Sequence, residues 1–147
     1  MRISSLTGLL LLAAAPAFAQ DAAAPQDAPD TAFEIELNGA ADTDAGNCRL
    51  TFVARNQTGT PLDQVAYEFA VFDTSGRVTQ IVAFDFGAMV AGKTRILQFD
   101  VGGMACGDVS GIVANDAIVC TVEGTENAGI CLSSLAARSL TDIQFGI

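Results

Sequence analysis

Apolar and polar residues alternate along most of the chain from Phe33 onward, and this period of two is the feature that most limits its fold. Side chains of a β-strand point alternately to opposite faces, so the pattern is typical of strands that are buried on one face. It predicts strands within residues 33–37, 48–54, 65–71, 78–86, 95–101, 109–113, 118–122 and 143–145.

Turn-forming residues separate these segments. Residues 56–61 combine Asn, Gly and Pro, residues 73–76 begin with Asp and end with Gly, and glycines recur at 91–93 and 102–103. Seven or eight short strands at this spacing predict an all-β, antiparallel β-sandwich in a single domain over residues 33–147. Only residues 132–139 have a composition suited to a helix, which would be short.

The N-terminal residues have the features of an export signal. Met1 and Arg2 give a basic start, residues 6–15 are mostly apolar, and Ala17-Phe18-Ala19 matches a small-x-small cleavage site. We expect cleavage after Ala19 by the general secretory route, because no pair of arginines is present. Residues 20–32, rich in Ala, Pro and Asp, are predicted to form a flexible leader. The mature protein is therefore expected in the periplasm or outside the cell.

Four cysteines follow the predicted signal: Cys48, Cys106, Cys120 and Cys131. An even number in an exported chain indicates two disulfides, and three pairings are possible. A metal site is the alternative, but there is no C-x-x-C spacing and no histidine. Cys48 begins one predicted strand and Cys106 follows the end of another, so antiparallel neighbours would place them together. This reasoning favours Cys48–Cys106 with Cys120–Cys131.

Charge and composition exclude several functional classes. The chain has 7 basic and 17 acidic residues, a formal net charge of −10, and no histidine. This excess of negative charge opposes binding to nucleic acid. The lack of histidine excludes Ser-His, Cys-His and His-zinc catalysis. No segment after the signal reaches about 18 apolar residues, so no integral membrane segment is expected there.

A short motif resembles that of a known family. Phe69-Ala70-Val71-Phe72-Asp73 is similar to the Phe-x-Leu-Tyr-Asp signature of the FxLYD family, and Gly76 follows it. The surrounding turns also resemble the family over residues 50–101. The first turn contains Asn56, Thr58, Pro61 and Leu62. The second is Val90-Ala91-Gly92-Lys93, which precedes a strand that ends at Phe99. The resemblance implies an immunoglobulin-like sandwich without established catalytic residues. From the motif itself we expect Phe69 and Val71 to face the core and Asp73 to accept backbone hydrogen bonds.

Several polar groups are candidate sites. Residues 42–47 place oxygen ligands at alternate positions, as calcium loops do, but the glycine is misplaced and the twelfth position is Val53, so an acidic turn is the better interpretation. Lys93 is the one unconventional base for a serine nucleophile. Asn56-Gln57-Thr58 fits the glycosylation sequon and equally a turn. Carboxylates that could support hydrolysis are Asp85, Asp100, Asp108 and Asp116.

The sequence therefore favours a binding protein over an enzyme. We expect no cofactor, no catalytic residues and no metal, and we expect a protein partner in the cell envelope that contacts loops or a strand edge. The C-terminal segment 141–147 is a candidate for such an edge, although closing its own sheet is the simpler interpretation. The alternatives are a carboxylate-dependent enzyme and a weak calcium- or small-ligand-binding protein.

Overall fold

A computed structural model describes residues 32–147, so the predicted signal 1–19 and residues 20–31 of the predicted leader lie outside it. Ala32, the last residue of that leader, is buried, and its carbonyl accepts a hydrogen bond from the Gln57 N–H. The strands are β1 (Phe33–Asp42), β2 (Cys48–Asn56), β3 (Leu62–Asp73), β4 (Val78–Met89), β5 (Thr94–Val101), β6 (Val109–Val122), β7 (Thr125–Glu126), β8 (Leu135–Ser139) and β9 (Gln144–Gly146). The helical elements are a 3-10 turn, η1 (Cys106–Asp108), and α1 (Ala128–Ser133).

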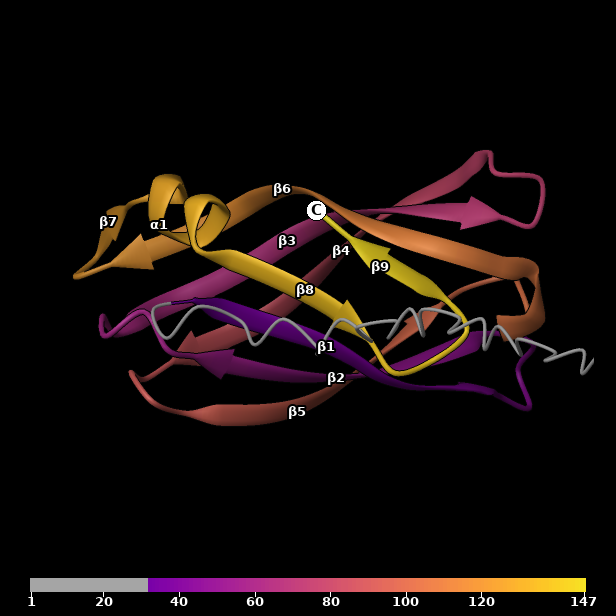
Figure 1. Ribbon diagram of the computed structural model, residues 1–147, viewed down its shortest axis with the longest axis horizontal. Helices are drawn as coiled ribbons and strands as arrows, with labels where there is room; N and C mark the ends of the chain where they lie inside the picture. Colours follow the sequence, from indigo (N-terminus) through magenta and orange to yellow (C-terminus); the bar gives the residue numbers. More distant parts are fainter. Residues whose placement is uncertain (1–31) are drawn as a thin grey trace, which may run out of the picture.

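The strands form two sheets that pack face to face. One sheet has the order β5-β2-β1-β8, and the other has the order β4-β3-β6-β7, with β9 pairing with β6 as its fifth strand. Figure 1 shows the two sheets along the length of the molecule, with α1 and β7 together at one end. The predicted all-β sandwich is confirmed. The strands are longer than expected, since β6 alone has 14 residues.

Phe52 is buried in the core between the sheets and belongs to a cluster of aromatic rings. Its ring centroid lies within 6.1 Å of those of five other phenylalanines, namely Phe69, Phe84, Phe86, Phe99 and Phe145. Tilted and edge-on aromatic pairs stabilise a core beyond the area that they bury. This cluster joins both sheets in a chain that has no tryptophan.

The sandwich departs from a purely antiparallel arrangement at two places. β8 runs parallel to β1, with Leu135 opposite Phe33, and β9 runs parallel to β6, with Phe145 opposite Ile112. The predicted strands 109–113 and 118–122 are also one strand, β6, whose pairing with β3 shifts in register near Asp116. Residues of low strand propensity lie at this irregularity, and a bulge accommodates them without ending the strand.

The helix predicted over 132–139 is wrong. The helix α1 ends at Ser133, and Leu135–Ser139 forms strand β8. Its Leu and Ala residues favour helices, but the strand conformation buries Leu135 against the core and lets Arg138 bind the carboxylates of Glu34 and Glu36. Tertiary contacts therefore override local propensity in this segment.

Both disulfides form as predicted. Cys48 is joined to Cys106, and Cys120 is joined to Cys131. The first attaches η1 to the start of β2, and the second attaches α1 to β6. The phenol of Tyr67, which is fully buried, donates a hydrogen bond to the Cys131 carbonyl at 2.9 Å. The short helix is thus held by a covalent link and by a core side chain.

Candidate functional site

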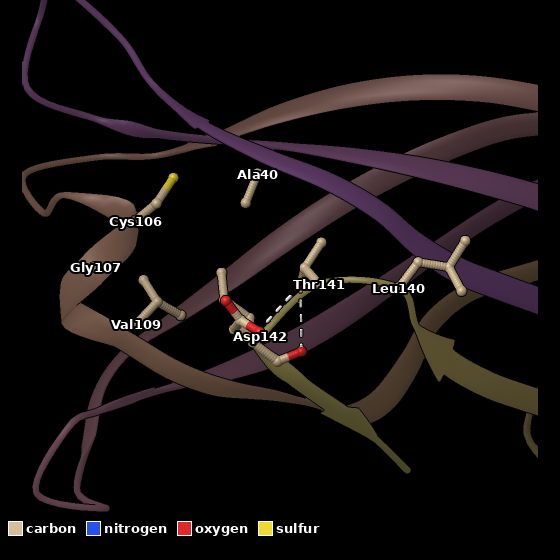
Figure 2. Close-up of a pocket in the computed structure, with 8 residues that line it drawn as sticks. Ala40, Cys106, Gly107, Val109, Leu140, Thr141 and Asp142 are labelled. Atoms are coloured by element: carbon tan, nitrogen blue, oxygen red, sulfur yellow. Dashed lines mark hydrogen bonds between the residues drawn. The ribbon is translucent and has the colours of Figure 1, made fainter.

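A groove opens between the two sheets at the end of the molecule that carries η1. It has a volume of about 530 Å³, which is within the usual range for ligand sites. Figure 2 shows Ala40 on β1 at the top of the groove, with the Cys106–Val109 segment to the left and Thr141 and Asp142 below. The residues that line it are Ala40, Cys106, Gly107, Val109, Leu140, Thr141, Asp142 and Ile143.

The upper wall of the groove in Figure 2 is the second half of β1, which has no paired strand on the side away from β2. β8 pairs with β1 only from Phe33 to Leu37, and the chain then turns away at Leu140, whose N–H donates to the Leu37 carbonyl at 2.9 Å. Beyond Leu37 the register with β2 shifts at a bulge. In the described part of the chain, residues 39–42 of β1 therefore pair with β2 alone.

The alternation of hydrogen bonds shows which backbone groups point away from β2. The Phe33 N–H donates to the Ser134 carbonyl, so the backbone groups of Phe33 face β8. The backbone groups of the next residue, Glu34, therefore face β2, where Glu34 lies opposite Arg55. In an antiparallel pair every second residue bonds to the partner strand, so Thr51 and Arg49 of β2 face β1 as Arg55 does. Gly39 and Ala41 lie opposite Thr51 and Arg49, and their backbone groups therefore bond to β2. The N–H and C=O of Ala40 therefore face outward, toward the place that a further strand would occupy.

Ala40 also points toward the core side and yet is exposed. It lies opposite Leu50, which is fully buried, so both side chains are on the inner face of the sheet. Ala40 itself is exposed and lines the groove. The groove thus combines an unpaired strand edge with an unfilled position of the core.

Two connections fix the other walls of the groove. The Cys48–Cys106 disulfide and a hydrogen bond from the Cys106 N–H to the Asp42 carboxylate, at 2.6 Å, position η1. The bend between β8 and β9 is held by the Thr141 hydroxyl, which accepts a hydrogen bond from the Ile143 N–H at 3.2 Å. Val109 and Ile143 are almost fully buried beneath the groove, so its floor is apolar.

The residues of the FxLYD-like motif have structural roles. Phe69 and Val71 are fully buried, as predicted, whereas Phe72 is half-buried on the other face of β3. The Asp73 carboxylate accepts hydrogen bonds from the Ser75 N–H at 2.8 Å and the Arg77 N–H at 3.1 Å, as predicted. The Ser75 hydroxyl, followed by these backbone groups, holds the pKa of Asp73 below its ordinary value. Gly76 completes the turn with a φ of 79°.

Asn56 is a buried structural residue. Its side-chain amide donates to the carbonyls of Thr60 and Met89, each at 2.8 Å, and its side-chain oxygen accepts the Thr58 hydroxyl at 2.7 Å. The side chain is fully buried. A glycan cannot be attached to an amide nitrogen in this position, so the turn interpretation of the sequon is the correct one for the folded chain.

The candidate catalytic carboxylates are dispersed. Asp85 accepts hydrogen bonds from Gln64 on the outer face of one sheet, and Asp100 is bound by Arg49 on the outer face of the other. The hydrogen bond and charge of Arg49 lower the pKa of Asp100. Asp108 lies in η1 and Asp116 on β6, and both are exposed. No pair of these four carboxylates faces an enclosed apolar wall together. Lys93, the unconventional base, lies exposed in a turn.

The calcium-like segment 42–47 is a hydrogen-bonded turn. Thr43 and Asn47 bond to each other through backbone and side chain, and the Asn47 side-chain oxygen accepts the Gly103 N–H at 3.0 Å. The Asp42 carboxylate is bonded to the Cys106 N–H. Two of the oxygen ligands proposed from sequence therefore serve the protein's own backbone. Within residues 32–147, no group of three or more His, Cys, Asp or Glu residues is arranged to hold a metal ion.

The sequence did not single out two features of the first sheet. Glu34 and Glu36 are buried, and Arg138 binds both, while Arg55 binds Glu34 at 2.8 Å. The groove residues Ala40 and Leu140 were also missed. The only signal for them was the run of small residues at 39–41, where the alternation of large apolar residues in β1 stops.

No family model, curated protein or solved structure matches the chain. The resemblance to the FxLYD family therefore rests on the residues of its motif alone. Among the described residues no helix is long and apolar enough to cross a membrane.

Proposed function

We propose that this chain is a non-enzymatic binding module outside the cytoplasm, and that it binds an extended segment of a protein partner in the cell envelope. The observation that carries the proposal is the exposed, inward-facing Ala40 on the unpaired half of β1. A strand added there would bond to the free backbone groups of β1 and place alternate side chains over Val109 and Ile143. Strand addition of this kind takes its affinity from backbone bonds and its specificity from pockets for alternate side chains.

Two further observations support the location and the absence of catalysis. The signal-like residues 1–19 and the two disulfides are typical of a protein exported to an oxidising compartment. The four candidate carboxylates are exposed and dispersed over different elements. A carboxylate mechanism requires two such groups close together, in environments that give them different proton affinities. The four carboxylates here do not form such a pair.

The proposal is tested by photo-crosslinking in the native envelope with a benzophenone amino acid at Leu140, which is 63% exposed beside the groove. The matched control carries the same probe at Ile96, which is 72% exposed on the outward edge of β5. Each probe is placed in a chain that also carries a proline at a strand-edge residue whose N–H faces away from the neighbouring strand. This proline is Ala40→Pro at the proposed site or Thr94→Pro on β5 as the control. Proline removes one edge N–H and is tolerated where that N–H faces solvent.

We expect a reproducible partner crosslinked from Leu140, lost in the Ala40→Pro chain and retained in the Thr94→Pro chain. Circular dichroism must show that both proline variants remain folded. The same partners crosslinked from Leu140 and from Ile96, or a Leu140 crosslink that survives Ala40→Pro, would contradict strand addition at β1.

A further inference from the structure

The rim of the groove is acidic. Asp142 lines it directly, and Asp42, Asp44 and Asp108 belong to the β1–β2 turn and to η1 at the same end of the molecule. All four are exposed, and no ion pair of the described residues involves them. None of the residues that line the groove is basic, and Arg49, which lies beside Asp42 and Asp44, is paired with Asp100. The rim therefore carries negative charge that the protein does not neutralise.

Charge at a rim of this kind selects partners more than it strengthens binding. Exposed carboxylates attract cations over distances of roughly the Debye length, about 8 Å at physiological ionic strength. They also repel anionic segments, and the chain's net charge of −10 adds to this repulsion. The charge of this rim therefore favours the binding of a cationic segment over a neutral or anionic one.

On the basis of the proposed function, we infer that the occupant of the groove is a basic, strand-forming segment of another protein. In an added strand, one side chain points inward and its two neighbours point outward. The inward side chain is apolar and of moderate size, because it fills the space before Ala40 above the apolar residues Val109 and Ile143. The neighbours on either side are Lys or Arg, which the exposed carboxylates at this end of the molecule attract through the solvent.

The strand is short, because the open edge offers few bonding positions. Outward backbone groups are available at Ala40 and, two residues further, at Asp42, where β1 ends. The bend at Leu140 limits the groove on the other side. A segment of about five residues is therefore sufficient to occupy the edge.

The test uses three acetylated and amidated heptapeptides with the pattern Thr-x-Val-x-Val-x-Thr, in which every x is Lys, Ser or Glu. Binding to the purified protein is measured by amide chemical shifts in NMR, at low and at physiological salt. The double variant Asp44→Asn and Asp142→Asn removes charge from the rim. Asp116→Asn, an exposed carboxylate on β6, is the matched control.

We expect the Lys peptide to shift the amides of Ala40 and Leu140 and to bind at least about tenfold more tightly than the Ser peptide at low salt. Higher salt and the double variant should remove most of this advantage, and Asp116→Asn should not. Equal binding by all three peptides, or tighter binding by the Glu peptide, at these same amides overturns the basic partner and leaves strand addition intact. A complete absence of shifts at Ala40 and Leu140 overturns both.

Discussion

Asn56→Asp is the substitution that tests the interpretation of the buried turn most sharply, because it changes hydrogen-bonding capacity with almost no change in volume. The Asn56 amide nitrogen donates to the carbonyls of Thr60 and Met89, each at 2.8 Å. A carboxylate oxygen in its place would face two carbonyl oxygens and could donate to neither. The opposite oxygen would still accept the bonds from Thr58.

The expected cost follows from these contacts. A buried polar group left without a partner costs about 1–3 kcal/mol. The carbonyls of Met89 and Thr60 both lose the amide donor, although the Thr58 hydroxyl remains 3.2 Å from the Thr60 carbonyl. The new charge is buried without a cation, which adds to the cost. We expect the free energy of unfolding to fall by about 4 kcal/mol at neutral pH, a large share of the stability of a small domain.

Urea unfolding followed by circular dichroism measures this change, provided that the m-value stays constant. Burial favours the neutral carboxylic acid, so the folded variant binds a proton more readily than its unfolded chain does. Its deficit relative to the wild type should therefore shrink as the pH falls. Gln57→Glu, a neighbouring exposed position, is the control for net charge. A deficit below about 1 kcal/mol, well under the cost of two lost buried bonds, or one that does not change with pH, would refute the reasoning.

Three further predictions concern stability. Burial raises the pKa of Tyr67, the only tyrosine, well above its ordinary value. Tyrosinate absorbance should therefore appear together with unfolding, and the free energy of unfolding should fall as the pH rises past about 10, where the unfolded phenol ionises. Because the pKa of Asp73 is lowered, its contribution to the free energy of unfolding is present above the ordinary value of 3.8 and is lost as the pH falls below it. The melting temperature of Asp73→Asn should therefore lie below that of the wild type at neutral pH and approach it in acid. Replacing the bridge 48–106 by serines should cost about 4 kcal/mol, and replacing the bridge 120–131 about 3 kcal/mol, in urea titrations, because the first closes the longer loop; equal losses would contradict the loop-length argument.

The period-two alternation was sufficient to predict the sandwich, because inward residues such as Phe52 and Phe69 must be buried between two sheets wherever the strands pair. The disulfide pairing followed from the positions of cysteines at strand ends. The alternation could not reveal the parallel neighbours, since the order of strands depends on where the chain crosses between sheets. Leu135–Ser139 was misassigned because its strand conformation depends on Phe33 and on the carboxylates beside Arg138, which are distant in the sequence.

The groove could not be predicted from local sequence for a similar reason. Ala40 is exposed although it lies on the inner face of its sheet, and whether the opposite sheet covers it depends on residues far along the chain. The run of small residues at 39–41 was its only local signal. The FxLYD-like motif, which drew attention in the sequence, lies in the core and in the β3–β4 turn. Its residues explain how the fold is built, whereas the proposed binding groove is formed by small residues that no motif marks.

The way in which the fold treats its other strand edges argues that the β1 edge is kept open for a ligand. Unpaired edges invite unwanted pairing between chains, and proteins commonly block them. The Arg95 guanidinium donates to the carbonyls of Phe86 and Ala88 on β4, and Gln80 on β4 donates to the Gly102 carbonyl beyond β5, so side chains link the adjacent β4 and β5 edges.

No comparable side chain covers β1 beyond Leu37 in the described structure, and residues 39–41 are Gly, Ala and Ala, which leave the backbone accessible. What protects this edge is charge. If two copies paired through β1, the acidic end of each copy, with Asp42 and Asp44, would approach the negative charge of the other, and this repulsion opposes self-association. The same carboxylates attract a cationic strand. A strand edge that repels a second copy of the chain and attracts a cationic strand has the properties of a binding site. For this reason we place the partner at the β1 edge.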